Sequence, residues 1–320
     1  MIKKRKLGKT RIQVSEIGLG GFQIGEPTII NNKSDTSFGG MEEKYAVDLI
    51  KHAVKLGVNT FDTADVYSLG SSEYRLGLAL NDIRENVNIF TKAGNLITNP
   101  SENDISYHHL IASINRSLKR LKTDYVDIFQ VHIPPRTEEE FSEIEKTFKE
   151  IKSDGKAKYV GISVGIKYEE GIEIIKRGIA DTIQIYFSLI DIKPLKELLP
   201  LAKKENIGII IAEPLAQGLL TNKYKKNYVF PENDLRSNVY SKKLLEKKLK
   251  RVEQLKFLIK ENRTLNQAAL AYVLGRDEVS TCIPGAKSIE QLESNIESVN
   301  MKLENFELKM IHEIQEKWND

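Results

Sequence analysis

Cysteine is nearly absent from this chain of 320 residues, which contains only Cys282. Within one chain, a single cysteine excludes a disulfide framework, a cysteine-based zinc site and an iron–sulfur cluster, and no other metal site is predicted. Long apolar runs are also missing, and none approaches the roughly 20 residues of a membrane span. The start of the chain, residues 1–6, is rich in basic residues, but the stretch after it is too polar for a signal peptide. We therefore expect a cytoplasmic protein.

No excess of one charge is present either. The chain has 48 Lys and Arg residues against 45 Asp and Glu residues, a net charge of +3. Such a balanced surface argues against a dedicated nucleic-acid or membrane partner. The basic tract over 242–251 carries leucines at helical spacing, which predicts an amphipathic helix with a solvated face.

Two common catalytic motifs are missing. The stretch from Gly18 to Phe22 is rich in glycine, but the third glycine of a G-x-G-x-x-G loop would fall on Gln23. The dinucleotide loop of an open sheet is therefore not predicted. A nucleophile elbow, the strained turn that exposes a catalytic serine, is also absent.

What the chain does have is a regular alternation of strand-like and helical segments without a break in composition. This pattern predicts the α/β class and a (β/α)8 TIM barrel, with residues 1–320 forming a single domain. A hairpin over 2–14 precedes the barrel, and extra helices follow it. The predicted strands are 16–21, 58–62, 87–92, 125–131, 158–163, 182–186, 207–212 and 280–283. The predicted helices are 42–56, 72–80, 105–120, 137–152, 168–177, 192–203, 241–261, 264–275, 288–297 and 304–318. Long loops are predicted over 26–40 and 217–240.

Ionisable residues stand at the C-terminal ends of three predicted strands. Asp62 ends the second strand, and Tyr67 follows it by five positions. Lys92 ends the third strand, and His132 follows the fourth. Because the C-terminal ends of parallel barrel strands open on one face, we expect these four side chains to meet there.

Such a cluster suits proton transfer. A tyrosine with a pKa near 10 is a weak acid at neutral pH, and the ammonium of Lys92 is expected to lower that pKa. Asp62 would pair with Lys92, Tyr67 would protonate a developing alkoxide, and His132 would position the carbonyl. The cluster contains no electron source, which implies a hydride donor, a nicotinamide.

Other interpretations stay open. Taken singly, Asp62 could cap a helix, Lys92 could be solvated, and Tyr67 and His132 could be packing residues. A Schiff-base enzyme with Lys92 as its nucleophile would need no cofactor. A nucleotide-sensing regulatory subunit would bind NADPH with negligible turnover.

Several motifs resemble one family along the whole chain. They are Lys6–Thr10, Gly57–Tyr67, Ser72-Glu73, Leu76-Gly77, Thr91-Lys92, Leu118–Asp127, Gln184, Glu213–Gly218 and Ile283–Ala286. With these residues the chain resembles the aldo-keto reductases, in the branch that includes potassium-channel β subunits and bacterial reductases. The resemblance implies NAD(P)H-dependent reduction of an aldehyde or ketone, with Asp62, Tyr67, Lys92 and His132 as the catalytic set. NADPH is the expected donor, and NADH is a second possibility.

The resemblance also implies a cofactor site. Gly21 and Phe22 would line the nicotinamide, and Ser163 and Gln184 would hold its carboxamide. The remaining positions, which would follow the diphosphate and then hold the adenosine 2′-phosphate and adenine, are Pro214, Leu215, Gln217, Gly218, Lys223, Arg236, Gly285, Ala286, Lys287, Gln291 and Asn295.

Three positions depart from the family pattern. Val164 stands where an Asn or Arg usually follows the carboxamide serine. Ala212, beside Glu213, replaces an aromatic that often stacks on the nicotinamide. Gln291 stands where another branch has an Arg. A small carbonyl compound is the predicted partner. The sequence leaves the identity of this substrate, the direction of the reaction and the oligomeric state open.

Overall fold

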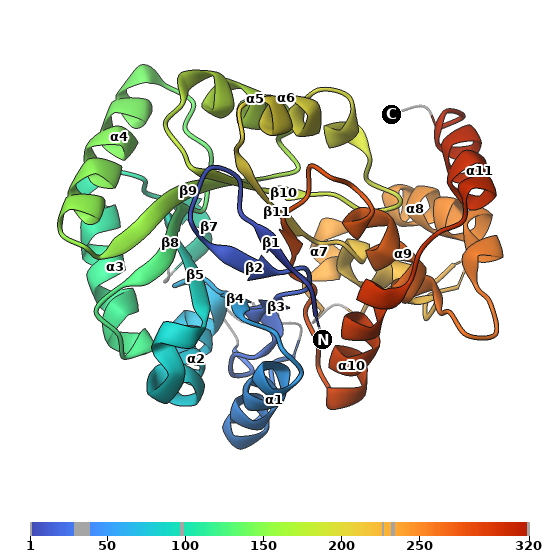
Figure 1. Cartoon of the computed structure of the whole chain (residues 1–320), viewed down its shortest axis with the longest axis horizontal. Coiled ribbons are helices and arrows are strands. Elements are labelled where there is room, and N and C mark those ends of the chain that lie inside the picture. The colour runs from blue at the N-terminus through green and yellow to red at the C-terminus, as the bar shows by residue number, and fades with distance from the viewer. Residues whose placement is uncertain (1, 29–38, 97–98, 226, 232–233, 319–320) are drawn as a thin grey trace.

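The computed structural model describes residues 2–28, 39–96, 99–225, 227–231 and 234–318. Its centre is one eight-stranded sheet in the order β12-β11-β10-β9-β8-β5-β4-β3, in which every neighbouring pair is parallel. Helices surround these strands on the outside (Figure 1). The strands are β3 (Leu19–Gly20), β4 (Thr60–Asp62), β5 (Asn88–Ala93), β8 (Val126–Val131), β9 (Ala157–Gly165), β10 (Thr182–Tyr186), β11 (Gly208–Ala212) and β12 (Thr281–Cys282).

The two edge strands meet and close the sheet. Ile17 and Cys282 form a parallel bridge. The Gly18 N–H donates to the Cys282 carbonyl at 2.8 Å, and the Cys282 N–H donates to the Glu16 carbonyl at 3.0 Å. Closure therefore pairs the two edge strands of the eight-stranded sheet with each other. The predicted (β/α)8 barrel is confirmed.

The helices pack their apolar faces on the outside of this ring. In α3, for example, Leu110, Ile114 and Leu121 are buried, and the Ser106 hydroxyl caps the first turn by accepting from the His109 N–H. The α-helices are α1 (Glu43–Lys55), α2 (Ser71–Leu80), α3 (Tyr107–Leu121), α4 (Glu138–Ser153), α5 (Tyr168–Arg177), α6 (Leu198–Lys204), α7 (Arg236–Val239), α8 (Lys242–Gln254), α9 (Leu265–Leu274), α10 (Ile289–Glu297) and α11 (Asn305–Gln315).

In two predicted helices, a 3-10 turn replaces part of the expected helix. The helix expected over 192–203 is divided into a 3-10 turn, η4 (Lys193–Leu195), and α6. Pro194 lies at the start of η4. Its missing N–H is tolerated at this position, but its ring disfavours a helical conformation for the residue before it. The helix expected over 241–261 ends as α8 at Gln254 and is followed by the 3-10 turn η6 (Lys256–Leu258).

The N-terminal hairpin closes the base of the barrel. Strands β1 (Lys4–Lys6) and β2 (Gln13–Ser15) pair in antiparallel fashion, and the hairpin lies across the middle of the ring in Figure 1. Leu7 and Val14 pack with Phe90, Ile128 and Ile210 from the barrel interior. The predicted hairpin is therefore confirmed, and its apolar side chains seal the N-terminal mouth.

The segment between β5 and α3 differs from the prediction. A short antiparallel ribbon of β6 (Asn95–Leu96) and β7 (Asn99–Asn103) separates β5 from α3 and was not predicted. Most of the predicted loop 26–40 lies outside the described residues. Within the described ranges, no helix combines the length and apolar character needed to cross a membrane.

Candidate active site

The structure brings the four predicted catalytic side chains together at the C-terminal mouth. Asp62 ends β4, Lys92 lies in β5, Tyr67 begins the 3-10 segment η2 (Tyr67–Gly70), and His132 follows β8. The Lys92 ammonium lies 2.5 Å from Asp62 Oδ1 and 3.5 Å from the Tyr67 hydroxyl. The Tyr67 and His132 ring centres are 5.8 Å apart.

Asp62 and Lys92 form the buried floor of this cluster. Asp62 is 2% exposed and Lys92 is 0% exposed. The second carboxylate oxygen of Asp62 accepts from the Gln184 amide at 2.8 Å and from the Gln130 amide at 3.1 Å. Lys92 also donates to the Thr63 carbonyl at 2.8 Å. These bonds satisfy a buried charge pair and fix its orientation. Gln130 was not predicted, although a glutamine within an apolar strand is a usable signal.

The electrostatics correct one expectation. The pKa of Tyr67 is raised well above 10 by burial and by the carboxylates of Asp62, Glu213 and Asp65, so the expected lowering by Lys92 was wrong. The main physical reason is burial of the phenol, and the Asp62 carboxylate, in contact with the ammonium, adds to the rise. Burial also lowers the pKa of Lys92, although Asp62 opposes this effect.

His132 is uncharged at neutral pH. Burial and the nearby Lys92 ammonium lower the pKa of His132 to about 3. Its Nδ1 lies 3.5 Å from the Asn95 amide nitrogen, a contact supplied by the unpredicted ribbon. A neutral imidazole carries one N–H donor, the property needed to hydrogen-bond a carbonyl oxygen.

A groove of about 1470 Å³ opens above the cluster, and Asp62, Tyr67 and His132 line it. Lys92 does not line the groove. All the residues that the family resemblance assigns to the cofactor line the same groove: Gly21, Phe22, Ser163, Gln184, Pro214, Leu215, Gln217, Gly218, Lys223, Arg236, Gly285, Ala286, Lys287, Gln291 and Asn295. The groove therefore runs from the cluster of Asp62, Tyr67 and His132 to α10.

Close packing shapes two parts of this groove. The Ser163 hydroxyl donates to the Gln184 side-chain oxygen at 3.5 Å. A Cβ added to Gly285 would meet the Gln23 side-chain oxygen at 1.9 Å, so a larger residue there would displace the Gln23 side chain. That Gln23 oxygen is buried and has no hydrogen-bond partner among the described residues.

Arg236 holds the long loop together. Its guanidinium pairs with both oxygens of Asp234, at 2.9 and 2.6 Å, and donates to the Gln217 carbonyl at 3.1 Å and to the Tyr224 hydroxyl at 2.7 Å. An arginine with these partners organises the groove wall. At the far end, the Lys287 N–H donates to the Gln291 side chain at 2.9 Å, and Ser288 caps α10.

The model of the aldo/keto reductase family matches residues 16–316 of this chain. A Bacillus subtilis protein named as the uncharacterized oxidoreductase YqkF is 32% identical over 306 residues, covering 94% of this chain and 92% of its own. The NADH-specific methylglyoxal reductase of Escherichia coli is 29% identical, with coverages of 98% and 99%. The holo form of aldo-keto reductase AKR11C1 from Bacillus halodurans superposes with a TM-score of 0.80 at 28% identity, with coverages of 98% and 96%.

The barrel, its groove and these relatives define an oxidoreductase of the kind that uses nicotinamide cofactors. More particularly, the chain belongs to the aldo/keto reductase family. The family predicted from the sequence is confirmed.

Proposed function

We propose that this protein reduces an aldehyde or ketone to an alcohol, with the hydride taken from a nicotinamide and the proton from Tyr67. The observation that carries the proposal is one juxtaposition. The Tyr67 hydroxyl lies 3.5 Å from the Lys92 ammonium, within a groove that is also lined by every residue assigned to the dinucleotide. Membership of the aldo/keto reductase family supports the same chemistry.

The charge states of Tyr67, Lys92 and His132 suit different steps of this reaction. The bound nicotinamide would supply the hydride. Because the pKa of Tyr67 is raised, its phenol stays protonated until the carbonyl oxygen becomes an alkoxide, which is a stronger base. Lys92 would then stabilise the phenolate, while Asp62 holds the ammonium in place. The neutral His132 would donate its N–H to the same oxygen and orient the carbonyl.

The burial of Lys92 argues against the Schiff-base alternative. A nucleophilic amine must reach its substrate, but Lys92 is fully buried, does not line the groove, and donates to Asp62 and to the Thr63 carbonyl. Its geometry suits a fixed charge better than a nucleophile.

For the cofactor we propose NADPH, with NADH as a second donor. Lys287 precedes the N-terminus of α10, and Gln291 and Asn295 lie along that helix in the groove. A helix N-terminus beside a basic residue favours a phosphate group such as the adenosine 2′-phosphate. One relative is named as NADH-specific, so both donors belong in any test.

The test compares the protein with its Tyr67→Phe variant. A panel of aldehydes and ketones is mixed with NADPH or NADH, and cofactor oxidation is followed by absorbance. The unaltered protein should turn over, and Tyr67→Phe should lower kcat by roughly 10²–10⁴-fold, the usual worth of a positioned proton donor, while the cofactor still binds. Cofactor binding without turnover of any carbonyl by the unaltered protein would instead indicate a nucleotide sensor.

A further inference from the structure

Glu213 is a carboxylate of the groove wall to which the proposed chemistry gives no role. It directly follows β11 and lines the groove. Its φ of 53° lies in the left-handed region that non-glycine residues rarely adopt. The Ala216 N–H donates to its carbonyl at 2.9 Å, and the Gln217 N–H donates to its carboxylate at 2.8 Å. The side chain is thus folded back onto the loop assigned to the cofactor diphosphate.

No ion pair neutralises this carboxylate within the described part of the chain. Two cations, Lys248 and Arg236, lower the pKa of Glu213, and each of them forms an ion pair with another acid. Lys248 pairs with Asp191 at 2.5 Å, and Arg236 pairs with Asp234 at 2.6 Å. Burial raises the pKa of Glu213 to about 7. The Gln217 N–H, Lys248 and Arg236 oppose this rise, and Asp191 adds to it.

The charged and titratable groups around Glu213 come from several elements. Asp191 follows β10, Lys248 lies on α8, and Arg236 begins α7. The carboxylate in turn helps to raise the pKa values of three phenols from the surrounding segments, Tyr67, Tyr186 and Tyr240. These effects place its charge beside the proton-transfer cluster as well as beside the 214–218 loop.

We propose that the Glu213 carboxylate opposes binding of the dinucleotide diphosphate, and that cofactor binding is therefore coupled to uptake of a proton by Glu213. The proposal rests on the proposed function, because it requires the dinucleotide to lie in this groove. An anionic diphosphate along residues 214–218 repels an ionised Glu213, whereas a protonated Glu213 is neutral and can donate a hydrogen bond to a phosphate oxygen.

The direction of the pH effect follows from linkage. Below about pH 7, Glu213 is already protonated in the cofactor-free protein, so the cofactor Kd should not change with pH there. Above about pH 7 binding must recruit a proton, so the Kd should rise with pH by at most about tenfold per pH unit. Removal of the charge by Glu213→Gln should abolish this slope and tighten binding on the alkaline side.

The experiment titrates the full chain with NADH, which lacks the 2′-phosphate whose own ionisation would overlap. Isothermal titration calorimetry from about pH 6 to about pH 9, in two buffers of different protonation enthalpy, yields both the Kd and the protons taken up. The unaltered protein and Glu213→Asp should take up close to one proton per NADH near pH 8, and Glu213→Gln close to none.

Glu290 offers a matched control. It also lines the groove, but the pKa of Glu290 is lowered by the Ser288 hydroxyl, so it stays ionised throughout the range. Glu290→Gln should keep the pH slope, whatever its effect on the Kd itself. A slope that survives in Glu213→Gln would overturn this inference and leave the proposed function standing. Failure of the unaltered protein to bind either NADH or NADPH would overturn both.

Discussion

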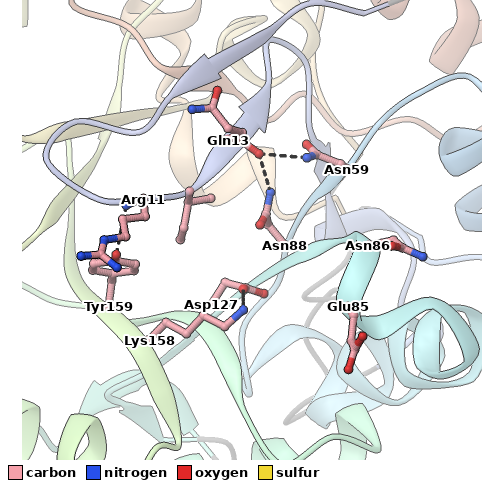
Figure 2. A pocket seen from close by; sticks show the side chains of 10 residues that line it. Arg11, Gln13, Asn59, Glu85, Asn86, Asn88, Asp127, Lys158 and Tyr159 are labelled. Carbon is pink, nitrogen blue, oxygen red and sulfur yellow. Dashed lines mark hydrogen bonds and ion pairs between the residues drawn. The ribbon is translucent and has the colours of Figure 1, made fainter.

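The two mouths of the barrel use buried charge differently. At the N-terminal mouth, a pocket of about 610 Å³ lies beside the hairpin. Figure 2 shows Lys158 paired with Asp127, and Asn59 and Asn88 both bonded to Gln13. The Asp127 carboxylate accepts from Arg84 at 2.8 Å, from Lys158 at 2.9 Å and from the Ile89 N–H at 2.9 Å. Among the described residues, no side chain of this pocket leaves a buried polar atom without a partner.

At the C-terminal mouth, part of the hydrogen-bonding capacity is unused. Gln23 and Gln217 line the groove, and the side-chain oxygen of each is buried and has no partner among the described residues. Buried polar atoms are costly to leave unpaired, and such atoms usually await a ligand or water. The comparison teaches that polarity alone does not identify a site. Both pockets are lined by polar residues, but among the described residues only the lining of the C-terminal groove includes side chains with buried, unpaired oxygens.

The largest expected effect comes from removing one cation at each mouth. Lys92→Met would leave the Asp62 carboxylate buried without its ion pair. The free energy of unfolding should fall by roughly 3–5 kcal/mol, and turnover should fall by roughly 10²-fold or more. Arg84→Met at the base should cost less stability, because Lys158 still pairs with Asp127. Urea unfolding and turnover per folded molecule measure both quantities.

Turnover per folded molecule distinguishes the two mouths. Arg84→Met should keep the turnover of each folded molecule, because Asp127 lies at the opposite end of the strands from Tyr67. An equal loss of turnover in the two variants would show that the base also contributes to the chemistry, and the division drawn here would fail.

Sequence periodicity was enough to predict which residues end a strand. Asp62 and Lys92 lie at the ends of β4 and β5, and parallel closure brings such positions together whatever the loops do. The same periodicity did not supply Gln130. A glutamine in an apolar strand is unusual, but the spacing does not show that its amide meets Asp62 across the barrel. Nor could it supply the ribbon that places Asn95 beside His132, since that segment has no clear alternation.

The charge states were harder still to predict. Proximity to Lys92 suggested a lowered pKa for Tyr67, whereas burial and three carboxylates raise it. One of the three, Glu213, has a positive φ, a backbone conformation that sequence periodicity does not indicate. A pKa depends on the sum of all nearby charges and on burial. The spacing of residues in a motif predicts neither quantity.

A smaller, pH-dependent effect on stability is expected at Asp65, near the buried floor formed by Asp62 and Lys92. Asp65 is fully buried, and neither of its carboxylate oxygens has a hydrogen-bond partner among the described residues. Burial and the neighbouring Glu73 raise the pKa of Asp65 to about 7. Between the unfolded value near 4 and this folded value, the folded state binds more protons. Stability should therefore fall as pH rises through that window, by at most about 1.4 kcal/mol per pH unit.

The variant Asp65→Asn should lose this contribution. The free energy of unfolding of both proteins is measured at about pH 5 and about pH 8. The contributions of the other titrating groups cancel in the difference between the two proteins. The variant should gain stability relative to the unaltered protein as pH rises. A constant difference between the two proteins would mean that Asp65 is already ionised in the fold at about pH 5, and that the C-terminal mouth tolerates more buried charge than we infer.

The smallest effects are expected among the asparagines at the base, where Asn59 and Asn88 both donate to the Gln13 carbonyl at 2.9 Å (Figure 2). Asn59 is buried and also accepts from the Ser15 N–H at 2.7 Å. Asn59→Ala would leave that buried N–H unpaired and should cost about 1–3 kcal/mol.

Asn88→Ala removes an exposed bond and should cost under about 1 kcal/mol. Neither variant should change turnover per folded molecule or the cofactor Kd, because both side chains hold the hairpin against the base. If Asn88→Ala proved as costly as Asn59→Ala, the Gln13 carbonyl itself, and not the pairing of Ser15, would be what anchors the hairpin. Thermal unfolding of the two variants side by side, with turnover measured on the same samples, decides between these accounts.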